Sequence, residues 1–202
     1  MWLKLLIYKS KRVYHWFKTG CLQALPAMVK NRFPQKKLVI AAITGTDGKT
    51  TTSFLLHHLL NQAGIKTGLI STIAAKVGQE EIDTGLHITN PQPAQLYSLL
   101  SQMLAAGCSH VVLEITSHGA YQFRNWGIKP QVGGITNVDH EHFDYHLNFN
   151  EYLKAKASIF KKTSLVFVNN ESKAYQALEL LLDQKIKTFS STSYLPTAIK
   201  QA

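Results

Sequence analysis

Residues 45–50 read Gly-Thr-Asp-Gly-Lys-Thr, and their types and order indicate phosphate chemistry. The apolar run at residues 38–42 predicts a buried strand before them, and residues 53–60 predict a helix after them. Glycines let a backbone approach a ligand closely, and the first turn of a helix offers unpaired N–H groups to an anion. The Lys49 side chain can reach the terminal phosphates of a nucleotide, and the Thr50 hydroxyl can bind Mg²⁺. We therefore predict a phosphate-binding loop made of Gly45, Thr46, Asp47, Gly48, Lys49, Thr50 and Thr51.

This loop has the short form Gly-x-x-Gly-Lys-Thr, because Ile43 stands where the longer form of the motif has a glycine. The alternative interpretation is a glycine-rich turn that carries a surface lysine. The strand expected before the loop and the helix expected after it favour phosphate binding, since that is the context in which such loops work.

A second polar cluster follows the apolar run at residues 110–115, which predicts another buried strand. Glu114 lies near the end of this run, where an acid can bind Mg²⁺ beside a nucleotide, because hard cations prefer carboxylate and hydroxyl oxygens. The alternative for Glu114 is an exposed acid at a strand end. Thr116, Gln122 and Arg124 follow shortly after it.

The third cluster spans residues 136–146, after a strand predicted at residues 132–137. On spacing alone its acids and imidazoles could form a metal cluster. They are His140, His142, His146, Asp139, Glu141 and Asp144. Without the first cluster, a histidine-rich polar turn would be the preferred interpretation. Tyr152 and Lys156 come next, on a helix predicted at residues 150–160.

Strands alternate with helices along the rest of the chain, and this predicts an α/β fold with a mainly parallel sheet covered by helices on both faces. Further strands are predicted at residues 66–72, 165–168 and 187–189, helices at 94–106 and 173–182, and a hairpin near Gly78. Ligands of such sheets gather at the carboxyl ends of the strands. All three clusters follow strands, so we expect them to share one edge.

The charge of the chain is concentrated at its beginning. The formal net charge is +10, and residues 1–40 hold nine Lys or Arg and no acid. The remaining residues are nearly balanced, so the basicity does not indicate a nucleic-acid partner of the main domain. Cys21 and Cys108 show no pairing pattern, which favours a reducing, cytoplasmic compartment. No apolar run is long enough to span a bilayer.

We divide the chain into a basic amphipathic helical arm at residues 1–37 and a domain at residues 38–202. A stripe of helical period runs through the arm, with Gly20 and Pro26 expected to interrupt it, and consists of Leu3, Leu6, Val13, Phe17, Cys21, Ala24 and Met28. Such a helix, here residues 1–33, can lie on an anionic membrane surface or pack against the domain with its lysines in water. The sequence does not decide between these.

The loop, the Glu-x-Thr-Ser-His-Gly run and the Asp-Tyr-His run at residues 144–146 together resemble the central ATP-binding domain of the Mur ligases. The resemblance is closest to the MurE type, the UDP-N-acetylmuramoyl-tripeptide synthetases, and it covers about residues 38–170. It implies a P-loop-type fold of three layers. It also implies an ATP-dependent ligase of peptidoglycan precursor synthesis, which adds an amino acid to UDP-N-acetylmuramoyl-dipeptide through an acyl phosphate.

The resemblance also implies roles for single residues. Lys49 would bind the ATP phosphates, Thr50 and Glu114 would hold one Mg²⁺, and His142 would hold a second. Lys156 would carry a carbamate and act as an anionic metal ligand. The substrate-contacting positions would be Thr89, Asn90, Thr116, Gln122 and Arg124. The chain departs from the usual pattern at Asp47, Asn90, Thr116, Glu141 and Leu147.

The family has a domain for the UDP group before the central domain and one for the incoming amino acid after it. About 38 residues precede the loop strand here, so we expect a fragment or a chain that a partner completes, with weak ATP binding and little ligase turnover. The amino acid, diaminopimelate or lysine, is not identified. The alternatives are a non-catalytic nucleotide-binding module with a scaffolding role and an arm that faces the membrane, and a related folylpolyglutamate- or cyanophycin-type ligase. In each case we expect the chain in the cytoplasm, at the inner face of the membrane if the arm binds lipid.

Overall fold

The computed structural model describes residues 2–77, 80–82, 90–139, 147–182 and 186–190, with only the backbone described for residues 2–5. Its described strands form one sheet in the order β4-β3-β2-β5-β1-β6-β7-β8. They are β1 (Val39–Thr44), β2 (Thr67–Ile70), β3 (Ala75–Val77), β4 (Glu80–Ile82), β5 (His110–Glu114), β6 (Val132–Ile135), β7 (Leu165–Asn169) and β8 (Ile186–Phe189). Neighbouring strands are parallel except around β3 and β4, which pair antiparallel as the predicted hairpin requires.

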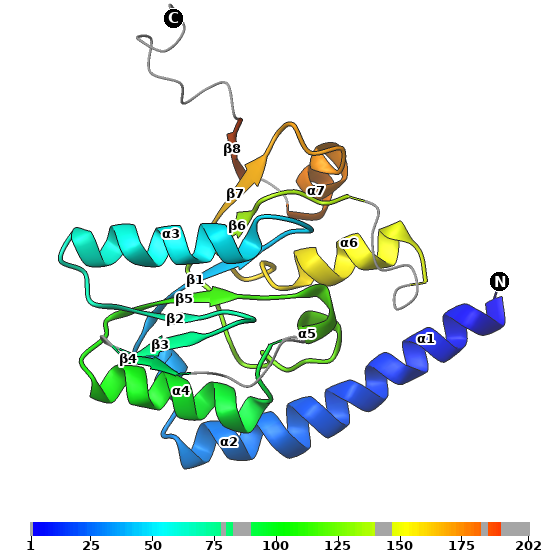
Figure 1. The fold of residues 1–202 in the computed structure, drawn as a ribbon. Coiled ribbons are helices and arrows are strands. Elements are labelled where there is room, and N and C mark those ends of the chain that lie inside the picture. Colours follow the sequence, from blue (N-terminus) through cyan, green and yellow to red (C-terminus); the bar gives the residue numbers. More distant parts are fainter. Residues whose placement is uncertain (1, 78–79, 83–89, 140–146, 183–185, 191–202) are drawn as a thin grey trace, which may run out of the picture.

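The helices of the domain alternate with these strands (Figure 1). They are α3 (Lys49–Gln62), α4 (Pro93–Ala105), α5 (Ser117–Tyr121), α6 (Phe149–Ser158) and α7 (Tyr175–Leu182). Each of them except α5 was predicted, to within a few residues at its ends. Five residues are too few to show a helical period, so α5 left no pattern in the sequence.

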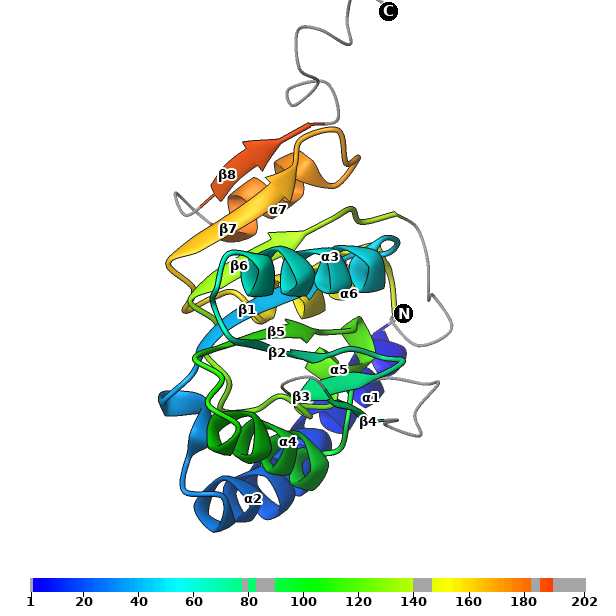
Figure 2. The ribbon, with the colours of Figure 1, turned by 60° about the vertical axis from the view of Figure 1, so that its left-hand side comes forward.

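Helices cover both faces of the sheet, as predicted (Figure 2). On one face, α3 packs Phe54, Leu56 and Leu60 against Ile43 and Val112 of the strands. On the other face a larger core lies between the sheet and α4, α6 and α7. Burial of these side chains stabilises the fold by roughly 1.5–3 kcal/mol for each large aliphatic or aromatic residue. The result is a three-layer α/β domain.

Strand register brings the predicted clusters to one edge of the sheet. Ile43 in β1 pairs with Glu114 in β5, and Thr44 in β1 pairs with Ile135 in β6. These three strands are parallel, so their carboxyl ends lie side by side. The loop after β1 and the segments after β5 and β6 therefore start from neighbouring positions, at the edge of the sheet where ligands of open α/β folds bind.

The arm forms an almost continuous helix of three parts, α1 (Trp2–His15), a π-helical segment η1 (Trp16–Ala24) and α2 (Leu25–Lys30), followed by the short 3₁₀ turn η2 (Pro34–Lys36). We expected Gly20 and Pro26 to interrupt the apolar stripe, and the helix itself continues through both positions. The Leu25 N–H donates to the Gly20 carbonyl in the wider π-helical pattern. Pro26 lies at the start of α2, directly after this segment, and Ala24 and Leu25 before it keep helical backbone angles.

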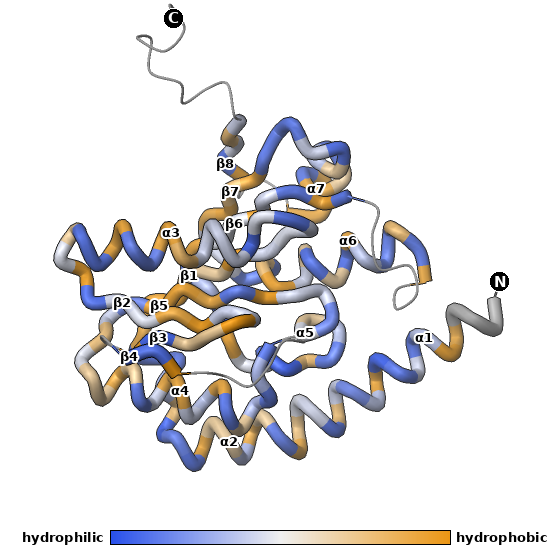
Figure 3. The backbone as a smooth tube through the Cα atoms, viewed as in Figure 1, coloured by the Kyte–Doolittle hydropathy of each residue, from blue (hydrophilic) through white to orange (hydrophobic). Residues whose placement is uncertain are grey.

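One side of the arm packs against the domain. Tyr8, Ala24 and Met28 are buried, and the Tyr121 hydroxyl donates to the Tyr8 carbonyl at 2.6 Å. The opposite side stays exposed, and the predicted stripe divides between the two sides: Leu6, Val13 and Phe17 are 51%, 64% and 54% exposed. Figure 3 shows apolar and polar residues alternating along this helix. No helix in the described part of the chain is long and apolar enough to cross a membrane.

Candidate active site

The loop after β1 has the backbone that a phosphate-binding loop needs. Gly45 lies so close to β6 that an added Cβ would be 1.8 Å from Thr136 Oγ1, so this position has no room for a side chain. Gly48 has φ +74° and is the N-cap residue of α3, whose N-terminus receives no side-chain cap. A glycine is favoured at such a positive φ. The N-terminus of α3 can therefore donate to an anion that lies over the loop.

Residues from the end of β6 hold this loop in place. Asn137 Oδ1 accepts from the Thr46 and Asp47 N–H groups at 3.0 and 2.8 Å, and Thr136 Oγ1 donates to the Asp47 carbonyl at 2.6 Å. Both side chains belong to the predicted third cluster, but no pattern in the sequence indicated that they would hold the loop in place. The side chains of Asp47 and Thr51 are exposed.

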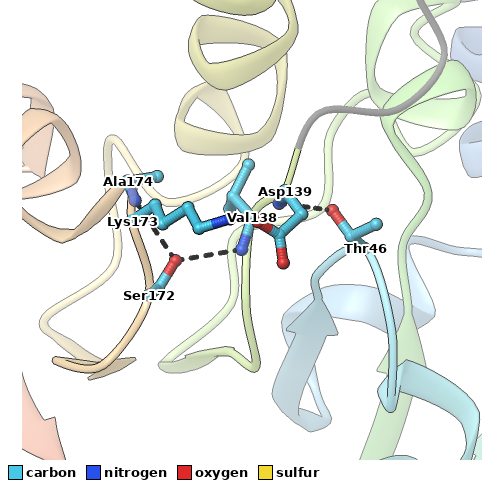
Figure 4. Close-up of polar contacts among 6 residues, drawn as sticks. All are labelled: Thr46, Val138, Asp139, Ser172, Lys173 and Ala174. Atoms are coloured by element: carbon cyan, nitrogen blue, oxygen red, sulfur yellow. Dashed lines mark hydrogen bonds and ion pairs between the residues drawn. The ribbon is translucent and has the colours of Figure 1, made fainter.

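The segment after β6 contacts the loop as well (Figure 4). The Asp139 N–H donates to Thr46 Oγ1 at 3.0 Å, and the Val138 N–H donates to Ser172 Oγ at 3.1 Å. Lys173 Nζ lies 3.8 Å from Asp139 Oδ1, in an exposed ion pair of little energetic weight. The described part of the histidine-rich cluster therefore begins beside the phosphate-binding loop. His140, His142 and His146 themselves lie outside the described residues.

Three of the predicted site residues lie at this loop, namely Lys49, Thr50 and Glu114. Thr50 and Glu114 contact each other directly. Lys49 Nζ donates to the Thr46 carbonyl at 2.6 Å, which holds its ammonium group against the loop. Thr50 Oγ1 lies 3.1 Å from both carboxylate oxygens of Glu114. Glu114 is 1% exposed, so the alternative of an exposed strand-end acid is wrong. Thr72, which follows β2, also donates to this carboxylate through its N–H at 3.2 Å, and no sequence signal indicated it.

This donor set fits Mg²⁺. The Thr50 hydroxyl and the Glu114 carboxylate are hard oxygen donors held together at the start of α3, beside a loop suited to phosphates. Mg²⁺ commonly binds one or two carboxylates together with nucleotide phosphates. These two side chains can therefore hold a metal ion that also contacts a nucleotide.

Lys156 reaches the same loop from α6. It is 1% exposed, so the alternative of a solvated helix lysine is wrong. Its Nζ donates to the Gly45 carbonyl and lies 4.6 Å from the centre of the Tyr152 ring. The Tyr152 hydroxyl lies 3.1 Å from Thr46 Oγ1. Asn148 caps the N-terminus of α6 and fixes where this helix begins.

The predicted substrate positions form a second group, with Asn90 at its centre. The buried Asn90 side chain donates to the Glu114 carbonyl at 2.5 Å and accepts from the Thr116 N–H at 2.9 Å. Arg124 donates to the Asn90 carbonyl at 2.9 Å through Nη1 and to Gln122 Oε1 at 2.8 Å through Nε. Asn90 thus joins this group to the strand that carries Glu114. Thr89 lies outside the described residues.

Comparisons with known proteins agree with this geometry. The family model for the Mur ligase middle domain matches residues 43–197. The UDP-N-acetylmuramoyl-L-alanyl-D-glutamate–2,6-diaminopimelate ligase of Cytophaga hutchinsonii is 35% identical over 173 residues, which are 83% of this chain and 35% of that protein. The ligase of the same name from Clostridium perfringens is 38% identical over 149 residues, 73% of this chain and 30% of that protein.

A solved structure of a ligase with this name superimposes with a TM-score of 0.71 at 24% identity, over 82% of this chain and 36% of that one, and supports the fold. The chain spans about a third of the length of the curated relatives it matches. The matched family model covers most of the chain and includes the loop, Glu114 and Lys156. The chain therefore belongs to the Mur ligase family, through its middle domain.

Proposed function

We propose that this chain is the nucleotide-handling part of an ATP-dependent acid–amino-acid ligase of peptidoglycan precursor synthesis. The substrates would be UDP-N-acetylmuramoyl-dipeptide and an amino acid, diaminopimelate or lysine. The observation that carries the proposal is the meeting of Lys49, Glu114 and Lys156 at one phosphate-binding loop. The names of the curated relatives support the choice of substrate.

The first step of the proposed reaction would bring a negatively charged carboxylate up to the negatively charged phosphates of ATP, before the amide forms. A substrate carboxylate attacks the γ-phosphate of ATP, giving an acyl phosphate and ADP, and the amino group of the amino acid then displaces phosphate. The first step is opposed by charge repulsion, so the protein must neutralise charge and position the groups. Lys49 supplies a cation at the loop, and the N-terminus of α3 supplies oriented N–H groups. A bound Mg²⁺, held by Thr50 and Glu114, would supply further positive charge.

We further propose that Lys156 works as a carbamate and that it and His142 hold a second Mg²⁺. An ammonium group cannot bind a metal ion, whereas a neutral amine that adds CO₂ becomes –NH–COO⁻ and releases one proton. The carbamate keeps one N–H, which can still donate to the Gly45 carbonyl that Lys156 contacts. Intact mass measured without acid, and ¹³C NMR in ¹³C-bicarbonate, test the carbamate directly. If Lys156 takes up no ¹³C from bicarbonate, it carries no carbamate and this assignment is refuted.

The ligase proposal is tested by trapping the acyl phosphate, which does not require the amino acid. The chain is incubated with Mg·ATP, UDP-N-acetylmuramoyl-L-alanyl-D-glutamate and hydroxylamine. We expect stoichiometric ADP and hydroxamate in amounts that depend on Lys49. Lys49→Ala is the test variant, and Lys162→Ala, at an exposed lysine, is the matched control.

Each outcome of this assay selects one function. ATP binding without hydroxamate would identify the non-catalytic module instead. Hydroxamate formed from a folate polyglutamate, and not from the muramoyl-dipeptide, would identify the folylpolyglutamate-type ligase. ATP binding that is equally strong in the wild-type chain and in Lys49→Ala would overturn the assignment of the loop itself.

We also propose that the arm contacts the inner face of the cytoplasmic membrane. The support is its exposed side, where Val13 and Phe17 lie on a helix rich in lysine. Such helices bind anionic lipid through combined apolar and electrostatic contact. Co-sedimentation with vesicles containing phosphatidylglycerol is expected to fall for Val13→Ser and Phe17→Ser. Leu180→Ser, at an 88% exposed leucine in α7, is the control. If co-sedimentation does not change with salt concentration or with the charge of the vesicle lipids, the proposal is refuted.

A further inference from the structure

An apolar groove lies between the arm and the segment that follows α5. It has a volume of about 380 Å³ and is lined by Lys9, Arg12, Val13 and Trp16 of the arm and by Phe123 of the domain. The four arm residues are spaced i, i+3, i+4 and i+7, so they share one stripe of the helix that is about 10 Å long. Figures 1 and 2 show the arm passing beside α5, which ends shortly before Phe123. We refer to this space as the arm groove.

A second pocket, of mixed polarity, adjoins the arm groove. It has a volume of about 270 Å³, and Arg12 and Phe123 line it as well, so the two spaces meet at this pair. Its other polar side chains include Asn125, Ser158 and Lys161 of the domain. We refer to it as the adjoining pocket. The combined site is therefore apolar along the arm and more polar on the side of the domain.

The pair of residues between the two spaces is held in a defined orientation. The guanidinium carbon of Arg12 lies 5.6 Å from the centre of the Phe123 ring, as in a cation–π contact. Phe123 has φ +56° and follows Gln122, the C-cap residue of α5, where a glycine is usual. This backbone turn places an aromatic ring beside Arg12. A guanidinium that is stacked in this way presents a rigid fork of N–H donors, which suits phosphate oxygens.

The charge around both spaces is positive. Lys9 and Arg12 line the arm groove, Arg12 and Lys161 line the adjoining pocket, and none of the described residues that line either space is acidic. Residues 1–40 as a whole contain no acid. Long cationic side chains place their apolar stems along such a groove and their charges at its rim. The combined site is therefore complementary to a ligand with an apolar chain and a negatively charged head.

The apolar wall of the arm groove is open to water when no ligand covers it. Val13 is 64% exposed and Trp16 is 44% exposed. Covering such side chains is favourable in proportion to the apolar area that leaves water. An acyl chain in the groove would cover both of them, and a phosphate at the end of that chain would meet the Arg12 guanidinium at the entrance to the adjoining pocket.

We infer that the arm groove and the adjoining pocket together bind one anionic phospholipid, with an acyl chain over Val13 and Trp16 and the phosphate at Arg12. The inference rests on the proposed membrane contact of the arm for the source of the lipid, but the shape and the charge of the site do not. It adds a site for a single lipid molecule to the general attraction between a basic helix and an anionic surface. Phe17 lies outside the described lining of the groove and belongs to the general contact only.

Calorimetry with soluble, short-chain lipids on the full chain tests the site without a membrane. The probe is dihexanoyl phosphatidylglycerol below its micelle concentration, compared with dihexanoyl phosphatidylcholine and with glycerol phosphate. Arg12→Gln is expected to weaken binding of the phosphatidylglycerol probe about tenfold, the effect of losing one charge-assisted hydrogen bond. Lys11→Gln is the matched control, because Lys11 is an exposed arm lysine outside the described lining of both spaces. This control removes the same charge and is expected to bind the probe within about twofold of wild type.

Two neighbouring aromatic residues test the acyl-chain part of the site. Trp16→Ala is expected to weaken binding of the phosphatidylglycerol probe about tenfold, the effect of leaving roughly 55 Å² of apolar surface in water. Phe17→Ala, at a residue that is 54% exposed, is the matched control and should change this binding by less than about twofold. A second measurement needs no variant, because the indole N–H signal of Trp16 in the wild-type chain is expected to shift in NMR spectra as the probe is added.

Several outcomes would overturn the inference. Equal binding by Arg12→Gln and Lys11→Gln, or no shift of the Trp16 signal at saturation, would show that the lipid does not occupy this site. Equally tight binding of the phosphatidylcholine probe would refute an anionic head, and equally tight binding of glycerol phosphate would refute the lipid chain.

The proposed membrane contact can fail separately from the lipid site. Vesicle co-sedimentation that depends on Phe17, without any binding of the soluble probe, would refute the lipid site and leave the membrane contact. Binding of the soluble probe that depends on Arg12 and Trp16, without co-sedimentation, would refute the membrane contact and leave the lipid site.

Discussion

Replacing Glu114 by Gln separates the structural role of this side chain from its proposed role as a metal ligand. The buried carboxylate accepts hydrogen bonds from Thr50 Oγ1, Thr72 Oγ1 and the Thr72 N–H. A glutamine of similar shape keeps one oxygen for the Thr72 N–H, and its NH₂ group can donate to either hydroxyl, because a hydroxyl can rotate to accept. The change also removes a buried charge, which is costly when no metal is bound. We expect the free energy of unfolding without ligand to change by about 1 kcal/mol at most.

The same substitution is expected to weaken the binding of Mg·ATP strongly. A neutral amide oxygen is a weaker Mg²⁺ ligand than a carboxylate, and mutation even of the groups that support metal ligands typically costs about 10–100-fold in metal affinity. A loss of about 2 kcal/mol raises Kd about 30-fold. Ligand at about 100 times the wild-type Kd stabilises the wild-type chain by about 2.7 kcal/mol, and by the same relation it stabilises the variant by only about 0.9 kcal/mol.

Urea unfolding, with and without Mg·ATP at one fixed concentration, measures both effects. Glu80→Gln, at an exposed glutamate in β4, is the control and is expected to keep the full stabilisation by ligand. A Glu114→Gln chain that keeps it too would show that Glu114 holds no metal. A variant that is unfolded without ligand would refute the hydrogen-bond reasoning, because the amide would then have failed to replace the carboxylate.

Three further predictions follow from the described contacts. Gly119→Ala is expected to lower the free energy of unfolding by about 2 kcal/mol, measured in urea, because the new Cβ would lie 2.0 Å from Asn90 Oδ1. Lys156→Met keeps the buried stem and removes Nζ, and we expect hydroxamate formation to fall about 100-fold or more and to lose any response to bicarbonate. Stability is expected to fall as pH drops from 7 to 5, measured by urea midpoints. Burial, the largest cause in each case, lowers the pKa of His15 and His57, so the unfolded chain binds more protons below pH 6.5.

Each of these predictions has a control in the same chain. Gly64→Ala meets no atom within 4 Å, and its φ of +79° should cost only about 1 kcal/mol. Lys162→Met, at an exposed lysine, should leave hydroxamate formation unchanged. His57→Gln should flatten the dependence of stability on pH, whereas His58→Gln, at an exposed histidine, should not. If stability depends on pH equally steeply in His57→Gln and His58→Gln, His57 is not a cause of the loss of stability at low pH.

Local sequence patterns were sufficient for the main elements of the fold and for the centre of the site. The glycines at 45 and 48, the lysine at 49 and the flanking apolar runs predicted the loop, because the requirements of such a loop are local in the chain. Glu114 followed from its place near the end of an apolar strand. Lys156 is different, since only the family resemblance distinguished it from other lysines, and its burial then agreed with that choice.

Other features depended on contacts between distant segments. Asn137 clamps the loop from about 90 residues away, and Thr72 reaches Glu114 across 42 residues. No periodicity encodes these pairs, because they depend on strand order and register. The role of Asn90 as the centre of its group is of the same kind, since it joins the ends of segments that only the sheet brings together.

The amino-acid sequence by itself was sufficient to predict a mainly parallel α/β domain, a glycine-containing loop between β1 and α3, and a basic helical arm. It could not determine which side of the arm meets the domain, because apolar residues occur on more than one side of that helix. The tertiary structure decided this by burying Tyr8, Ala24 and Met28 and leaving Val13 and Phe17 exposed. The same packing forms a cavity of about 480 Å³ between the arm and the domain. Its walls come from both segments, so the sequence of either segment alone could not predict it.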